Sequence, residues 1–407
     1  MKKKMKKIGL VIVSIFILMV IGVELFYLFG VKKDYVGAKL PEATIKEYAS
    51  KVIEKCSTAS YRPSCYDKEV PKYMDNPYKL SMEDAFKVTA EVQNQDKTFT
   101  YCHVLGHELS AKEVDKDQSK WKDVLTRCPS GVCSNGCLHG GMQERFRSDS
   151  LTEDQLNRLK PDFASLCRKK DTWTPTGLEQ GSCYHALGHL LMYATKADAT
   201  KASRLCDELT KNDEGKWYTT LCYDGVFMQI YQPLEPEDFA LVKNITPKKD
   251  GVDSFCSAYE SNKRESCHTE TWPLFFKEIM TPDGLYAFCQ NKDIVNKQKC
   301  FNALFYVAAA QLQLNVEKIT TFCDGTEKEV RGQCFASSAS RLIEVDYRNA
   351  DNALALCTEA DRQGVGENCY RELATFATYN YHSGSPESKK LCNSLPDNIK
   401  GLCLTQN

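Results

Sequence analysis

The chain alternates short apolar runs with polar turns, and many of the apolar runs end or begin at a cysteine. Runs such as FASLC, LYAFC, ITTFC and ALALC end at one, whereas CFNALFYVAAAQL, CFASSASRLIEV and CYRELATFATY begin at one. Apolar residues within the runs follow helical spacing, and the period-two alternation of strands is scarce. The pattern therefore predicts an all-α protein built from pairs of helices joined by short turns.

The cysteine that opens the second helix recurs every 33 to 35 residues from Cys267 to Cys403. A fixed period of this length is typical of one supersecondary unit copied many times. Helix-start signals precede first helices, as in Thr281-Pro282 and Ser385-Pro386. Since a single hairpin cannot bury its apolar face alone, stacked neighbours must do so, and we expect an α-solenoid of disulfide-linked helical hairpins.

The first 33 residues differ from the rest. Five lysines precede an apolar run over residues 8–30, which contains Glu24 as its one charge and is long enough to cross a bilayer as a helix. No convincing signal-peptidase site follows, and the lysine bias puts the N-terminus in the cytoplasm. The sequence thus predicts a single-pass membrane protein with most of the chain extracytoplasmic. Its expected parts are an anchor (1–33), a tether (34–50), N-terminal repeats with the histidines (51–240) and C-terminal repeats (241–407).

The 20 cysteines are consistent with an oxidising compartment. Their number is even, their spacing is regular, and no C-x-x-C motif suggests zinc ribbons or thiol redox chemistry. We expect each hairpin to carry a disulfide between the end of its first helix and the start of its second. The expected local pairs are Cys56 with Cys65, Cys128 with Cys137, Cys167 with Cys183, Cys206 with Cys222, Cys256 with Cys267, Cys289 with Cys300, Cys323 with Cys334, Cys357 with Cys369 and Cys392 with Cys403.

Two cysteines remain outside this scheme. Cys102 occupies a second-helix position whose first-helix partner is absent, and Cys133 is surplus in the next turn. One interpretation is a single inter-repeat bridge between Cys102 and Cys133. The other is that both are free thiolates that bind a metal.

The period and layout resemble tetratricopeptide and Sel1-like solenoids, and a disulfide in each hairpin is similar to the cysteine-rich Sel1-like proteins. The resemblance covers residues 50–407 in period alone. It implies an architecture, and it implies no functional residue. Solenoids of this kind commonly bind partners, so a protein or an envelope polymer is an expected ligand.

Five of the seven histidines stand at the start of second helices in three consecutive repeats, in CHVLGHELS, CLHGGMQERF and CYHALGHLLM. A fourth repeat reads CYDGVFMQIY and places an aspartate in register. Later repeats lose the pattern. The candidate metal ligands are therefore His103, His107, His139, His185, His189 and Asp224.

Histidines at i and i+4 lie on one helix face, so His103 with His107 and His185 with His189 can each bind one ion. Neighbouring helices pack about 8–10 Å apart, which lets imidazoles from adjacent repeats meet. Gly106 and Gly188 precede the second histidine of each pair and indicate a close approach of another backbone or a ligand. Imidazoles suit transition metals, and we favour zinc or iron over copper.

Two functions follow from this pattern. A metal held by the histidines could be catalytic, with Glu108, Glu144 or Asp224 as candidate general bases and metal-bound water as nucleophile. Alternatively, the histidines are buried structural groups, and the protein is a non-enzymatic scaffold. Net charge is −1, and no basic patch indicates a nucleic-acid partner.

Overall fold

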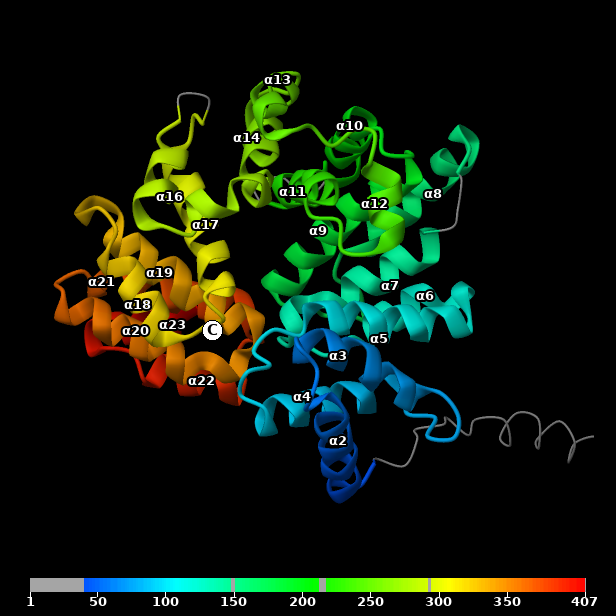
Figure 1. The fold of residues 1–407 in the computed structure, drawn as a ribbon, viewed down its shortest axis with the longest axis horizontal. Helices are drawn as coiled ribbons and strands as arrows, with labels where there is room; N and C mark the ends of the chain where they lie inside the picture. The colour runs from blue at the N-terminus through cyan, green and yellow to red at the C-terminus, as the bar shows by residue number, and fades with distance from the viewer. Residues whose placement is uncertain (1–39, 148–150, 212–216, 292–293, 407) are drawn as a thin grey trace, which may run out of the picture. The chain divides into compact units, whose positions relative to one another are not determined.

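The computed structural model describes residues 40–147, 151–211, 217–291 and 294–406 (Figure 1). The chain divides into two compact units, residues 1–46 and 47–407. Of the first unit, only residues 40–46 are described, and they lead into helix α2 (Glu42–Cys56), which begins inside the expected tether. The fold of the second unit is all-α, as the sequence predicts.

The second unit consists of helices in successive pairs. The first helices of the pairs after α2 are α4 (Met82–Gln95), α6 (Trp121–Thr126), α8 (Glu153–Leu166), α10 (Ala199–Thr210), α13 (Val252–Cys256), α16 (Pro282–Cys289), α18 (Val316–Asp324), α20 (Ala350–Arg362) and α22 (Pro386–Asn393). The second helices are α3 (Arg62–Glu69), α5 (His103–Lys116), α7 (Gly136–Phe146), α9 (Gly177–Ala194), α11 (Tyr218–Tyr231), α14 (Ser261–Glu270), α17 (Lys297–Gln311), α19 (Lys328–Val345), α21 (Gly366–Asn380) and α23 (Asp397–Gln406).

Shorter elements connect the pairs. They are the α-helices α12 (Pro236–Val242) and α15 (Phe276–Ile279) and the 3₁₀ turns η1 (Val70–Met74), η2 (Gln118–Lys120), η3 (Cys133–Asn135), η4 (Lys249–Gly251), η5 (Trp272–Phe275) and η6 (Tyr347–Asn349).

Side-chain caps fix where several of the helices begin. Thr281 and Ser385 cap α16 and α22, and each is followed by proline at the first helical position, as the sequence predicts. Thr176 and Glu179 form a capping box at the start of α9. The cap therefore sets the register of α9 and, with it, the direction in which the histidines of this helix point.

Nine local disulfides each join the two helices of one pair across 9 to 16 residues, with Cα atoms 5.2–5.8 Å apart. They are the pairs expected from the cysteine period. They link Cys56 with Cys65, Cys128 with Cys137, Cys167 with Cys183, Cys206 with Cys222, Cys256 with Cys267, Cys289 with Cys300, Cys323 with Cys334, Cys357 with Cys369 and Cys392 with Cys403. Each local bridge contributes about 3 kcal/mol by restricting the unfolded chain.

A tenth disulfide joins one pair of helices to the next. It links Cys102 to Cys133 across 31 residues, with Cα atoms 4.7 Å apart. This is the inter-repeat bridge, the first of the two interpretations of these cysteines. No described cysteine is free, so none is available as a thiolate ligand of a metal.

The second helices of successive pairs pack against one another in chain order from α3 to α23. The later repeats also contact the early ones, because α21 packs on α9 and α19 packs on η3. The backbone N–H of Tyr347 donates to the carbonyl oxygen of Gly131 at 3.1 Å, and Arg348 donates to Gln93 at 2.9 Å. The C-terminal repeats are thus part of the surroundings of the histidine-bearing helices.

Glycines bring neighbouring second helices into backbone contact. A Cβ added to Gly140 of α7 would lie 2.2 Å from the carbonyl oxygen of His107 in α5. A Cβ added to Gly225 of α11 would lie 2.0 Å from the carbonyl oxygen of His185 in α9. The close approach expected at Gly106 and Gly188 is confirmed, since a Cβ at Gly188 would lie 2.1 Å from the carbonyl oxygen of Cys222 and one at Gly106 would lie 3.2 Å from the backbone nitrogen of Cys137.

The prediction of a single-pass membrane location is corrected by the structure. The anchor expected over residues 8–30 lies outside the described residues. Among the helices that are described, none has the length and apolar character needed to span a membrane. The longest, α9 and α19, have 18 residues, whereas a span needs about 20 predominantly apolar ones. The ten disulfides still indicate an oxidising, extracytoplasmic environment.

Candidate metal centre

Five histidines from α5, α7 and α9 converge in the second unit. Their ligand nitrogens form two sets, His103 with His107 and His139, and His139 with His185 and His189. Within each set, the nitrogens lie within 4.8 Å of one another. Because His139 belongs to both sets, it is the centre of the cluster.

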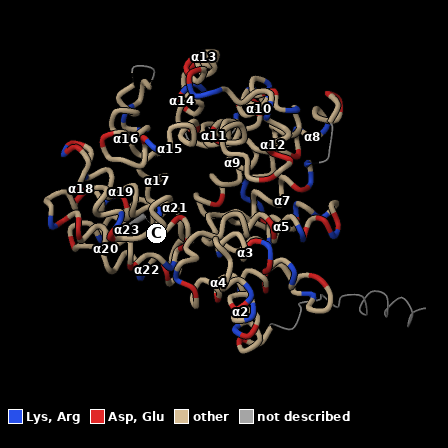
Figure 2. Tube along the Cα trace, in the orientation of Figure 1, with Lys and Arg blue, Asp and Glu red and all other residues tan. Residues whose placement is uncertain are grey.

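Charged side chains are unevenly distributed over the helices around the cluster. Helix α9 contains one charged side chain, Glu179, and α11 contains only Asp224. Helix α5 contains five charged side chains and α7 contains two, and both signs are interspersed along the described chain (Figure 2). Four of the five histidines are at most 6% exposed, and His185 is partly buried. The imidazoles therefore meet where little of their surface is exposed to solvent.

Within each i, i+4 pair, the Nε2 atoms face each other. They are 3.0 Å apart in His103 and His107 and 3.1 Å apart in His185 and His189. Two nitrogens bound to one tetrahedral zinc at about 2.0–2.1 Å are themselves about 3.3 Å apart. Both pairs thus have nearly the spacing that a shared cation requires.

Outer hydrogen bonds orient three of these histidines and fix the tautomers of His103 and His189. The carbonyl oxygen of Cys133 accepts from Nδ1–H of His103 at 3.3 Å, and Oε1 of Gln229 accepts from Nδ1–H of His189 at 2.6 Å. His185 is hydrogen-bonded to the backbone of Leu221. A neutral imidazole that donates from Nδ1 presents a bare lone pair at Nε2, which is the usual arrangement of metal-bound histidine.

A glutamine bridge connects the two pairs behind His139. Gln143 of α7 donates from Nε2 to Oε1 of Gln229 at 3.4 Å, and Gln143 also hydrogen-bonds His107. Since Gln229 accepts from His189, the glutamines link one pair to the other. Both glutamine side chains are buried, so they hold the rings in place.

Burial lowers the pKa of all five imidazoles. It lowers the pKa of His103 to about 4, with a further contribution from the positive charge of Arg341. The pKa values of His107, His139 and His185 fall well below 6.5 because of burial and of neighbouring histidines. That of His189 is also lowered, chiefly by burial. The cluster is therefore neutral at pH 7 and can bind a cation without first losing protons.

One side of the cluster opens on a cavity of about 1370 Å³. His103, His139 and His185 line this cavity, whereas His107 and His189 lie behind them. Met228 also lines it, with Sδ 3.2 Å from Nε2 of His185. Met228 therefore stands at the edge of the cluster, where its sulfur could contact a bound ion.

The structure does not bring Asp224 into either histidine set. Its carboxyl group lies near Ser266 and Lys299 of the neighbouring repeats, and burial raises its pKa. Asp224 is in register with the histidines along its own helix, but it is directed toward α14 and α17.

The other candidate bases, Glu108 and Glu144, do not line the cavity. Both are half-buried near Arg147, and burial raises their pKa values. Neither is placed to act on a molecule in the cavity.

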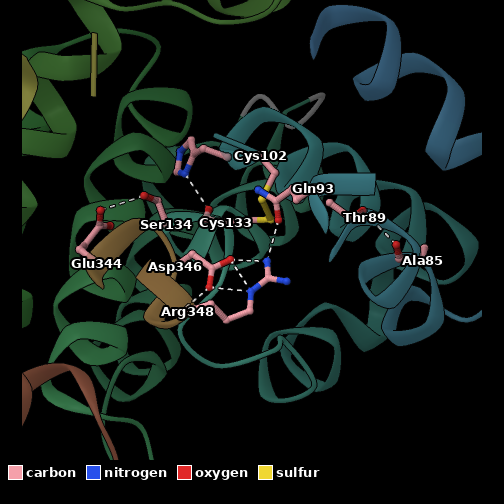
Figure 3. The surroundings of a disulfide bond; sticks show 10 residues. Ala85, Thr89, Gln93, Cys102, Cys133, Ser134, Glu344, Asp346 and Arg348 are labelled. Atoms are coloured by element: carbon pink, nitrogen blue, oxygen red, sulfur yellow. Dashed lines mark hydrogen bonds and ion pairs between the residues drawn. A yellow bond between two sulfur atoms is a disulfide. The ribbon is translucent and has the colours of Figure 1, made fainter. Parts of the chain in front are cut away.

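The C-terminal repeats supply residues around His103 that the sequence did not reveal. Ser134 donates to Glu344 of α19 at 2.9 Å, next to the Cys102–Cys133 bridge (Figure 3). Arg341 pairs with Glu344 at 2.5 Å and donates to the hydroxyl of Tyr101 at 3.3 Å. Only the packing of α19 on η3 brings these residues together, and no local motif marks them.

No protein-family model matches the chain, and neither a curated protein nor a solved structure matches it. The resemblance to tetratricopeptide and Sel1-like repeats is therefore limited to a cysteine-rich, helical-repeat architecture. The evidence for function comes from the histidine cluster itself.

Proposed function

We propose that the protein is an extracytoplasmic helical-repeat protein whose N-terminal repeats bind a transition metal through His103, His107, His139, His185 and His189. Stacked second helices, as in a solenoid, supply ligands from three consecutive repeats. A donor set made only of imidazoles suits zinc, iron, copper or nickel rather than calcium or magnesium. We favour zinc or iron.

The observation that carries the proposal is the contact between His185 and His189. Oε1 of Gln229 accepts from Nδ1–H of His189, so the neutral His189 ring presents a lone pair at Nε2. That lone pair faces Nε2 of His185 at 3.1 Å, close to the spacing of two nitrogens that bind one tetrahedral ion.

The position of the cavity makes the metal accessible. Three of the five histidines face the cavity, so a small molecule can approach the ion from that side. A transition metal with an open position can polarise a bound oxygen or lower the pKa of bound water, which permits hydrolytic chemistry. A solely structural metal would be closed on all sides.

Metal content is the first test. The full chain, produced in an oxidising compartment without chelators, should contain about one zinc or iron per molecule or more by elemental analysis. Stripping the metal should lower stability, because an ion at about 1,000 times its Kd adds about 4 kcal/mol to the unfolding free energy. A protein without bound metal whose unfolding is unaffected by added zinc or iron would contradict the proposal.

A further inference from the structure

The ligand sets leave the charge of a bound cation uncompensated. Both contain only histidines, and no described carboxylate joins them. Arg341 and Arg147 act on His103 and His107, but each is paired with a glutamate. The protein therefore adds little negative charge, and a divalent ion in this buried site requires an anion as an additional ligand.

That anion has one route of approach. The side of the cluster behind His107 and His189 is occupied by the buried residues Gln143 and Gln229. The opposite side opens on the cavity of about 1370 Å³, which is much larger than hydroxide or chloride needs. A larger organic anion can therefore enter and reach the metal.

The same cavity contains a second anion-binding group close to the cluster. The ring of Tyr101 stacks on His103 at 5.8 Å, and the guanidinium of Arg341 lies 5.5 Å from the Tyr101 ring. The distance between the Arg341 guanidinium and the His103 ring therefore cannot exceed the sum of the Tyr101–His103 and Arg341–Tyr101 distances. A ligand with a chain of several carbons can span this separation.

Arg341 is held in place and still has donors to offer. It lies over Tyr306 at 4.6 Å, and its hydrogen-bond partners are Glu344, Tyr101 and Tyr306. A guanidinium has five N–H groups, so these three contacts do not use all of them. Because Glu344 is bound by Arg341 and Ser134, its charge is largely neutralised toward the cavity.

We infer that the cavity binds an organic dicarboxylate, one carboxylate completing the coordination of the metal and the other accepting hydrogen bonds from Arg341. This inference rests on the proposed metal site and names the class of ligand that the site takes. Arg341 belongs to the C-terminal repeats, so these repeats supply the contact that favours a dicarboxylate over a monocarboxylate.

The test uses cobalt-substituted full-length protein, whose visible absorption reports on ligands that bind the metal. Adipate and hexanoate are the probes, because they have the same chain length and differ in the second carboxylate. Adipate should bind about tenfold more tightly, the effect expected of one charge-assisted hydrogen bond. Equal affinities, or no spectral change with either acid, would overturn the inference while the cobalt spectrum still showed that the metal site exists.

Two variants locate the second contact. Arg341→Gln should abolish the preference for adipate, so that the ratio of the adipate and hexanoate affinities falls to about one. Arg62→Gln is the matched control, because Arg62 also lines the cavity and is paired with an acid, Asp96. If Arg62→Gln removed the preference and Arg341→Gln did not, the second carboxylate would be bound elsewhere and the inference would be wrong. Failure of the wild-type protein to bind cobalt would instead refute the proposed function.

Discussion

Replacing His139 with alanine should nearly abolish metal binding, with a loss of affinity greater than about a hundredfold. His139 is the one residue common to both histidine sets, so its loss reduces each set from three donors to two. Outer-shell changes alone typically cost about 10–100-fold in metal affinity, and loss of a direct ligand should exceed that. Elemental analysis and zinc titration of the purified variant would measure the effect.

His268→Ala is the matched control for this variant. His268 is also buried, at 4% exposure, and it also follows the opening cysteine of a second helix, but it belongs to neither set. Truncating it should leave a comparable void in a different repeat and keep the wild-type metal content. Equal metal loss in the two variants would mean that the effect comes from destabilised packing and not from coordination.

The double variant Cys102→Ser, Cys133→Ser should lower metal affinity about 10–100-fold as well as stability. Cys102 immediately precedes His103, and the carbonyl oxygen of Cys133 accepts the hydrogen bond that orients the His103 ring. This disulfide also places Ser134 against Glu344 (Figure 3). Without the bridge, the turn is free to move and His103 loses its fixed tautomer.

A second double variant separates this effect from general destabilisation. The Cys102–Cys133 bridge closes a loop of 31 residues and should contribute about 4 kcal/mol of unfolding free energy. The Cys392–Cys403 bridge closes 11 residues far along the chain and should contribute about 3 kcal/mol. Cys392→Ser, Cys403→Ser should therefore lower stability by a similar amount and leave zinc affinity unchanged. A similar loss of affinity in both variants would rule out a specific role for the first bridge.

The helical hairpins could be read from the sequence because their signals are local. Apolar spacing, helix caps and the cysteine period each depend on residues close together in the chain, as at Thr281 and Ser385. The convergence of the histidines could also be expected, since equal positions in successive repeats meet when the second helices stack. The close packing at Gly140 and Gly225 follows from the same repetition.

The direction of Asp224 and the residues around His103 depend on long-range contacts, which the cysteine period does not reveal. Asp224 occupies the register of the histidines, yet the next repeat surrounds it with Ser266 and Lys299. Arg341 and Glu344 approach His103 only because α19 packs on η3, more than 200 residues away in the chain. Side-chain direction and long-range closure are properties of the packed molecule, so one sequence does not reveal them.

The most direct test is an anomalous-diffraction map from crystals of the full chain grown with zinc and recorded on both sides of the zinc absorption edge. The account predicts a strong peak at the five-histidine cluster, about 2.0–2.1 Å from Nε2 of His185 and His189 or of His103 and His107. A map without a peak there, with the imidazoles placed as described, would contradict the metal centre and leave a disulfide-bonded helical scaffold.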